Sequence, residues 1–193
     1  MTKRAKTLDK QMLTKVLDHV KSGAHPERDK VMLLLSHLGG LRAAEIAGLT
    51  WGDVLDASSN LSKTVLSIPA AIAKKGKGRD IPMHPDVYAA LQAYQTILGD
   101  VSAPDPLMTS TYTPHMSANY VAVYIRRVYK KCGFIGCSSH SGRRTFLTKL
   151  ARSSNNYGCS LHDVQRIAGH ANINTTEAYI EPSERAGAMV AAL

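Results

Sequence analysis

The sequence predicts a mainly α-helical protein with a small antiparallel β-sheet, an α+β arrangement. Apolar residues recur at helical spacing over most of the chain, which is the pattern of amphipathic helices. Two short runs containing β-branched residues flank a glycine-containing turn, as in a β-hairpin. The 193 residues suit one domain with a substantial core, since 44% are hydrophobic and 20% are charged. We therefore expect a single domain over residues 1–193.

The N-terminal part is expected to hold three helices. Residues 7–20 place their apolar side chains on one side of a helix. The next helix begins at Pro26, because proline suits a first helical turn, and it ends at Gly39-Gly40. This second helix is apolar almost all round, so it should be central. A short helix over residues 43–49 leads into a turn at residues 51–53.

The sheet is predicted in the middle of the chain. Residues 64–68 and 79–82 have the composition of two strands, joined by the lysine-rich turn KKGKG. Another helix begins at Pro85 and extends to about Leu98. After a proline-rich loop, residues 107–108 are a candidate third strand.

The second half is expected to be helical, over residues 117–131, 141–152 and 161–168. Ser160 is the predicted N-cap of the last of these helices, and Gly169 ends it. We expect Asn174 to cap a further short helix that carries Tyr179, and residues 181–193 to form a small amphipathic tail.

The composition favours a nucleic-acid partner. Lys and Arg number 24 against 15 Asp and Glu, which gives a net charge of +9 and a pI of about 9.6. A domain this basic suits a polyanion, although many small proteins are basic without binding one. The three cysteines form no C-x-x-C pair, which argues against a zinc site or a disulfide framework. The N-terminus lacks a signal-peptide core, and no apolar run approaches the roughly 20 residues of a membrane span. We expect a cytoplasmic protein with no membrane partner.

The segment from His140 to Tyr179 holds groups suited to phosphodiester chemistry. A tyrosine nucleophile with a pKa of about 10 needs nearby cations and a base, and Tyr179 is the candidate. His140 and Arg143 are three residues apart, which on a helix places them on one face. An arginine binds two phosphate oxygens, and an imidazole moves a proton. His170 follows a helix-ending glycine, where it is placed to donate to a phosphate. Each of these residues, taken singly, also fits a purely structural role.

Two upstream segments complete this set. Arg42 precedes Glu45 by three residues, a spacing that lets the carboxylate orient the guanidinium; a surface ion pair is the alternative. Lys74 lies in the turn between the two strands, where it can reach a leaving oxygen as a general acid. Lys75 and Lys77 compete with Lys74 for this role, and a solvated turn remains an alternative.

Four segments carry a family resemblance: GLRAAEIAGLTWGDV, AKKGKGRDIP, HSGRRTF and AGHANINTTEAYI. In order and spacing they resemble the catalytic segments of site-specific tyrosine recombinases of the phage-integrase type. The resemblance covers about residues 8–182 and leaves residues 183–193 as a tail. It implies the tyrosine-recombinase catalytic-domain fold, and an enzyme that cleaves and rejoins DNA through a 3′-phosphotyrosyl intermediate.

The resemblance also implies the role of each candidate. Arg42 and Arg143 would bind the scissile phosphate with help from His170, and His140 would transfer a proton. Lys74 would protonate the leaving 5′-oxygen. The nucleophile and the residue supporting the first arginine would be Tyr179 and Glu45.

Such chemistry implies no metal and no cofactor. The implied partner is double-stranded DNA, bound by a homotetramer on paired sites, with a monomer or weak oligomer in the absence of DNA. Further candidates for contact with DNA are the basic residues Lys75, Lys77, Arg79, Arg126, Arg127, Lys130 and Arg144.

The sequence departs from the family pattern in two ways. Gly142 stands where the family often has leucine, and we expect it to loosen that helical turn. We also expect the family's usual N-terminal core-binding domain, which clamps DNA, to be absent, as in an excised domain or a naturally short recombinase. Other functions stay open: a type IB topoisomerase-like enzyme that relaxes DNA, a DNA-binding regulator without catalysis, and a basic helical interaction module.

Overall fold

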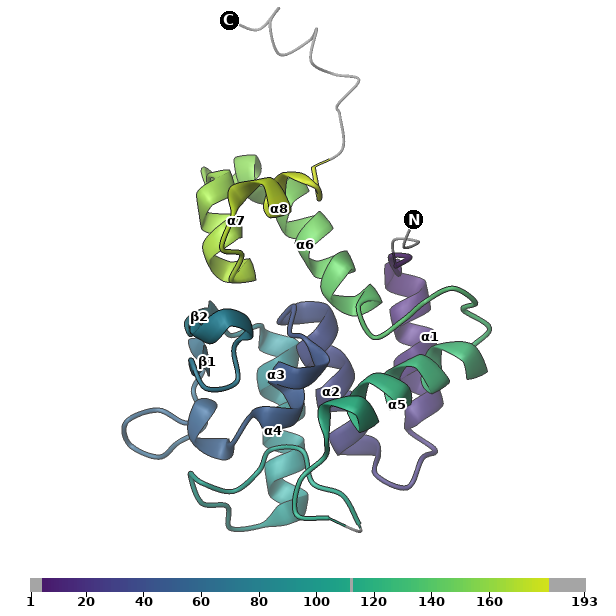
Figure 1. Ribbon diagram of the computed structural model, residues 1–193. Coiled ribbons are helices and arrows are strands. Elements are labelled where there is room, and N and C mark those ends of the chain that lie inside the picture. Colours follow the sequence, from purple (N-terminus) through teal and green to yellow (C-terminus); the bar gives the residue numbers. More distant parts are fainter. Residues whose placement is uncertain (1–4, 112, 181–193) are drawn as a thin grey trace, which may run out of the picture. The chain divides into compact units, whose positions relative to one another are not determined.

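The computed structural model describes residues 5–111 and 113–180 and divides into two compact units, Met1–Phe146 and Leu147–Leu193. Most described residues are helical, and one small sheet of two antiparallel strands is present (Figure 1). This architecture confirms the predicted fold class. Within the described ranges, no helix is long and apolar enough to cross a membrane. The tail predicted over residues 181–193 lies outside the described residues.

The first unit is built around one central helix. Its helices are α1 (Lys10–Val20), α2 (Pro26–Leu38), α3 (Ala43–Gly48), α4 (Pro85–Leu98) and α5 (Ala118–Lys131). Helix α2 packs against α1, α3 and α4, and α5 packs against α1 and α3 (Figure 1). Residues 31–35 of α2 are all buried, so the helix that is apolar all round is central, as predicted. Helix α1 begins at Lys10 rather than residue 7, because the Asp9 side chain accepts the Met12 N–H and caps it.

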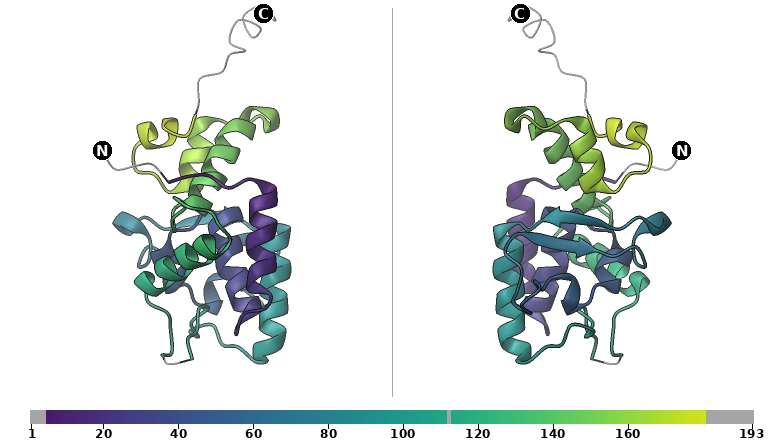
Figure 2. Two further views of the ribbon diagram at one scale, coloured as in Figure 1. Left: turned by 90° about the vertical axis from the view of Figure 1, so that its right-hand side faces the viewer. Right: turned by 90° about the vertical axis from the view of Figure 1, so that its left-hand side faces the viewer.

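The sheet pairs β1 (Val65–Ile68) with β2 (Arg79–Pro82), in the register Val65↔Pro82 and Ile68↔Arg79. Leu66, Ile68 and Ile81 are buried, which places one face of the hairpin on the core. The connection contains a short 3₁₀ turn, η2 (Lys74–Gly76), and it projects beyond the strands in the right-hand view of Figure 2.

The predicted third strand at residues 107–108 is wrong. The Leu107 N–H donates to Leu49 O, and Met108 O accepts from the Met116 N–H, so this segment pairs with loops rather than with the hairpin. Both side chains are fully buried. Their apolar character reflects burial beneath a loop, which sequence pattern does not distinguish from a short strand.

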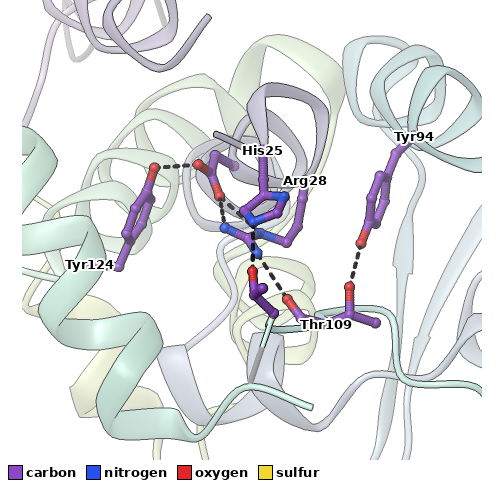
Figure 3. A network of polar contacts seen from close by, with 7 residues as sticks. His25, Arg28, Tyr94, Thr109 and Tyr124 are labelled. Atoms are coloured by element: carbon purple, nitrogen blue, oxygen red, sulfur yellow. Dashed lines mark hydrogen bonds and ion pairs between the residues drawn. The ribbon is translucent and has the colours of Figure 1, made fainter. Parts of the chain in front are cut away.

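A polar network ties the loop between α4 and α5 to α2 (Figure 3). Arg28 forms an ion pair of 2.7 Å with Asp29 and donates to Thr109 O at 3.0 Å. The Thr109 hydroxyl bonds the Tyr94 hydroxyl at 3.1 Å, and Tyr124 donates to Asp29. Burial, with the hydrogen bond to Asp29, raises the pKa of Tyr124. Its residues on α2 lie in the first turn of the helix, about 14 Å along the axis from the C-terminal end at Leu38. It therefore stabilises the fold at the end remote from Gly39.

The second unit consists of short helical elements. Helix α6 (Ser141–Ser153) enters it, followed by η3 (Ser154–Tyr157), α7 (Leu161–Ala168) and α8 (Ile173–Glu177). Ser160 caps α7 and Gly169 ends it in the left-handed conformation, both as predicted. The prediction for α8 was wrong in two respects. Asn172 caps it, because its side chain accepts the Asn174 N–H. Tyr179 lies in the turn after α8, where its N–H bonds Thr176 O and tightens the chain.

Candidate active site

The turn between α2 and α3 brings two candidate arginines together. Gly40 has a φ of +66°, which glycine adopts without strain, and a Cβ there would lie 2.3 Å from the Phe146 ring. The Gly40 carbonyl accepts a 2.6 Å hydrogen bond from Arg143 Nη1. Arg42, two residues later, is the N-cap residue of α3. Arg42 and Arg143, 101 positions apart in sequence, therefore meet at one turn.

Glu45 holds the Arg42 side chain. Its carboxylate accepts the Arg42 backbone N–H at 2.9 Å and the Arg42 guanidinium at 2.8 Å. Arg79 donates to both carboxylate oxygens, at 2.9 and 3.0 Å. Burial would raise the pKa of Glu45, but the hydrogen bonds from Arg79 and Arg42, with their charges, outweigh it and lower the pKa to about 2. Glu45 is therefore a carboxylate that orients two guanidinium groups.

The lysine side chains of the turn are exposed, while the residues just before the turn are packed against the protein. Lys74, Lys75 and Lys77 are exposed, and Ala73 just before them is buried. Ile72 contacts the last residue of α3, where a Cβ added at Gly48 would lie 2.5 Å from Ile72 Cγ2. The backbone of the turn is thus fixed close to α3, and its lysine side chains face solvent.

His140 and Arg143 lie at the start of α6, but only Arg143 is in the helix. The His140 carbonyl accepts the first helical hydrogen bond, from the Arg144 N–H at 2.9 Å, and His140 itself is exposed. Arg143 is 5% exposed. The expectation that both lie on one helical face is revised: His140 is the residue that precedes the first turn.

Gly142 has a packing role that sequence reasoning missed. It is buried, and a Cβ there would lie 2.3 Å from Ser36 Oγ and 3.0 Å from His37 Cδ2. His37 is held in turn by a 2.8 Å hydrogen bond to Tyr129. The loosening of this turn stays a prediction, and the structure adds a second effect: the missing side chain lets α6 pack closely on α2.

In the second unit, His170 and Tyr179 form a pair. Their rings stack with centroids 5.8 Å apart and an angle of 18° between planes. His170 Nδ1 bonds the hydroxyl of Thr176 at 2.9 Å, and Thr176 is fully buried. Gln165 donates its amide to His170 O at 3.0 Å. Sequence reasoning missed Thr176; its position three residues before Tyr179 was the available signal.

The predicted DNA contacts fall into two groups. Arg126, Arg127 and Lys130 are exposed on α5, as are the lysines of the turn. Arg144 is half-buried and donates to Ala5 O at 3.0 Å. The Arg79 side chain is only 4% exposed and is engaged by Glu45, so its prediction as a direct DNA contact is revised. Among the described residues there is no cluster of three His, Cys, Asp or Glu side chains that could hold a metal ion.

The site residues therefore form two groups, each inside one unit. The first unit gathers Arg42, Glu45, Arg79 and Arg143 around one turn. The same unit contains His140, which directly precedes α6, and Lys74 in the turn of the hairpin. The second unit pairs His170 with Tyr179. The first group is a cationic cluster suited to binding a phosphate, and the second is an imidazole stacked on a phenol.

Comparison with known proteins identifies the family. The model of the phage integrase family matches residues 6–185. The chain is 29% identical to the tyrosine recombinase XerC of Pelobacter propionicus over 157 residues, which cover 81% of this chain and 48% of that protein. It is 30% identical to the tyrosine recombinase XerD of Neisseria meningitidis over 159 residues, covering 80% of this chain and 50% of that protein. The chain thus spans about half the length of these relatives.

The fold is also similar to that of a solved integrase. The Tn1549 transposon integrase, in complex with transposon right end DNA, superposes with a TM-score of 0.77 at 21% identity. The match covers 100% of this chain and 67% of that one. With the family match spanning nearly every described residue and all the candidate site residues, the chain belongs to the phage integrase family.

Proposed function

We propose that the chain is the catalytic domain of a site-specific tyrosine recombinase, an enzyme that cleaves and rejoins DNA through a phosphotyrosine intermediate. The observation that carries this proposal is the pairing of Tyr179 with His170, in a chain that also holds Arg42 and Arg143 at one turn. Membership of the phage integrase family supports the same chemistry. Integration, excision and inversion of DNA all use this reaction, and they differ in how the sites are arranged.

In the cleavage step, the phenolic oxygen of Tyr179 attacks the phosphorus, and the bond from phosphorus to the 5′-oxygen breaks. The phenol proton passes to His140, and the Lys74 ammonium supplies a proton to the departing 5′-oxygen, so protons and charge balance. The product is a 3′-phosphotyrosyl link and a free 5′-hydroxyl. Rejoining reverses these steps from a 5′-hydroxyl and consumes no ATP.

Binding of the phosphate falls to the arginines. Arg42 and Arg143 bind its non-bridging oxygens, and His170 donates to the same group. Glu45 keeps Arg42 oriented, because its buried carboxylate holds the guanidinium at 2.8 Å. These positive groups supply the charge stabilisation that a metal supplies in other enzymes, so the mechanism uses no metal or cofactor.

The partner we propose is double-stranded DNA. A net charge of +9 and the exposed basic residues of α5 and the lysine turn support it, as does a fold similar to that of an integrase solved with DNA. We further propose that the two compact units act as one catalytic domain. Exchange between two sites requires several active subunits, so we propose a homotetramer on paired sites and a monomer or weak oligomer without DNA. Such an enzyme would work in the cytoplasm, on DNA.

The test is formation of a covalent adduct. The native chain is incubated with a library of nicked duplexes of randomised sequence, in which the 5′-hydroxyl fragment diffuses away after cleavage. A protein–DNA adduct should appear on a denaturing gel, also in EDTA, and peptide mass spectrometry should place it on Tyr179. Tyr179→Phe should abolish the adduct, because it lacks the attacking oxygen.

The matched control is Tyr157→Phe, which removes a hydroxyl from an 81% exposed tyrosine in the same unit. This variant should form adduct like the native chain. Adduct formation by Tyr179→Phe, or no adduct from any library member with the native chain, would overturn the proposal. Loss of the adduct in EDTA would overturn its metal-free mechanism.

A further inference from the structure

Arg79 is a cation whose position differs from that of the other basic residues of the hairpin. Lys74, Lys75 and Lys77 are exposed, whereas the Arg79 side chain is 4% exposed at the start of β2. Both of its terminal nitrogens donate to Glu45, at 2.9 and 3.0 Å, in the parallel two-bond geometry typical of strong arginine–carboxylate pairs. A DNA phosphate would have to displace this carboxylate, so direct DNA contact is not the role that the geometry favours.

Glu45 is shared between Arg79 and Arg42. Its Oε1 accepts one guanidinium nitrogen from each, and its Oε2 accepts Arg79 and the Arg42 backbone N–H. A single buried carboxylate therefore connects the start of β2 with the N-terminus of α3. Because arginine donates through a rigid planar fork, the two-bond contact fixes both the distance and the orientation of β2 relative to α3.

The lysine turn is anchored to α3 on both sides. Before the turn, Ile72 packs on Gly48 so closely that a Cβ at Gly48 would lie 2.5 Å from Ile72 Cγ2. After the turn, Arg79 reaches Glu45 in the first turn of α3. Lys74 lies between these two anchors, on a backbone that would otherwise be a mobile hairpin end.

We propose that Arg79 is a positioning residue, which holds the lysine turn in register with Arg42 through its ion pair with Glu45. The inference rests on the proposed function, in which Lys74 protonates the leaving oxygen of a phosphate bound by Arg42. A general acid acts only within hydrogen-bond reach of the oxygen it protonates. Arg79 therefore contributes to cleavage through the placement of Lys74 and makes no contact with the substrate.

The experiment compares two leaving groups. The duplex that the native chain selects from the nicked library is made with its bridging 5′-oxygen, and again with sulfur at that position. A thiolate leaves without protonation, so the sulfur duplex removes the need for a general acid. Lys74→Ala should fail on the oxygen duplex and recover on the sulfur duplex.

Arg79→Met keeps an unbranched apolar stem and removes the guanidinium donors. We expect adduct formation on the oxygen duplex to fall roughly 10- to 100-fold, because a misplaced Lys74 loses part of the rate enhancement that a general acid contributes. On the sulfur duplex, adduct formation should return to within about threefold of native. Arg79→Lys keeps the charge without the fork and should show a smaller loss with the same recovery. Gly48→Val displaces Ile72 at the other anchor and should also be rescued by sulfur.

Lys77→Met is the matched control, because it removes an exposed charge from the same hairpin without touching Glu45. If Lys77 contacts a phosphate directly, Lys77→Met should weaken DNA binding and reduce the number of counterions released on binding by about one. Its adduct formation should then be affected equally on the oxygen and sulfur duplexes. If Arg79→Met behaves in that way, or loses equal activity on both duplexes, the inference is overturned. If the native chain forms no adduct on either duplex, the proposed function itself fails. If sulfur rescues Lys74→Ala but not Arg79→Met, the proposed function stands and only the role of Arg79 is rejected.

Discussion

The two units position their candidate residues by different physical means. In the first, a buried carboxylate is clamped by two guanidinium groups, and α6 packs against α2 with no room for a side chain at Gly142. In the second, a neutral hydroxyl of Thr176 holds His170, whose ring stacks on Tyr179 in a turn after a five-residue helix. The first arrangement relies on permanent charge and tight packing, and the second on one hydrogen bond and short capped helices.

The difference corresponds to what each group is proposed to do. Arginines that bind a phosphate must be fixed before the substrate arrives, since preorganised charges need no rearrangement during the reaction. A nucleophile must instead move toward phosphorus and back, so weaker restraints suit it. The first unit should therefore be sensitive to pH and packing, and the second to the loss of a single hydrogen bond.

The largest effect is expected from Glu45→Gln. Burial raises the pKa of Glu45, but its arginine partners lower it from the usual 4.5 to about 2. Because the folded pKa is the lower one, its stabilisation is complete above pH 4.5 and is lost as the pH falls towards 2. Glu45→Gln should cost about 3 kcal/mol of unfolding free energy at neutral pH, and the difference from native should shrink to nearly zero at pH 2.

Urea unfolding followed by Trp51 fluorescence measures this change, because Trp51 is the only tryptophan and is buried in the first unit. The control is Asp18→Asn, which breaks an exposed ion pair with Lys21 and should change stability by less than about 1 kcal/mol. A constant difference between native and Glu45→Gln across the whole pH range would show that the carboxylate charge is not what stabilises the first unit.

An intermediate effect is expected from Gly142→Ala. Alanine usually stabilises a helix by about 1 kcal/mol relative to glycine, but here the Cβ would lie 2.3 Å from Ser36 Oγ. We expect a net loss of about 2 kcal/mol in the same unfolding measurement, because the close contact forces the two helices apart. Adding Ser36→Ala removes the nearest atom and should recover at least about 0.5 kcal/mol relative to additivity. Stabilisation by Gly142→Ala alone would mean that the packing is looser than described.

The smallest effect is expected from Thr176→Val, which replaces the hydroxyl with a methyl group of similar size. The loss of one hydrogen bond, about 1 kcal/mol, should slow adduct formation roughly fivefold by leaving His170 less well oriented. Thr176→Ser keeps the hydroxyl and should remain within about threefold of native. Since the contact lies wholly in the second unit, the unfolding reported by Trp51 should change little. Equal impairment in Thr176→Ser would show that the methyl group, not the hydrogen bond, holds the site.

The sequence alone determined the elements whose causes are local. The apolar pattern of α2, the proline and glycine at its ends, and the Ser160 and Gly169 caps of α7 depend on residues within a few positions of one another. The candidate site residues could also be named from the sequence, because each motif is contiguous and the motifs occur in the order of the family. The spacing of Arg42 and Glu45 predicted a contact that the structure contains.

Only the tertiary structure decided which distant groups meet. In the sequence, Arg79 is one more cation beside the lysine turn. In the structure, β2 lies beside α3, and the Arg79 guanidinium meets Glu45, 34 residues away along the chain. In the sequence, Gly142 is a residue that weakens a helix, and only the packing of α2 against α6 gives it a steric role. Residues 107–108 have the apolar pattern of a strand because they are buried beneath a loop, and that burial also depends on tertiary packing. The local sequence pattern shows whether a residue prefers to be buried. Which group it contacts once buried depends on how remote segments pack, and that contact sets the residue's charge state and role.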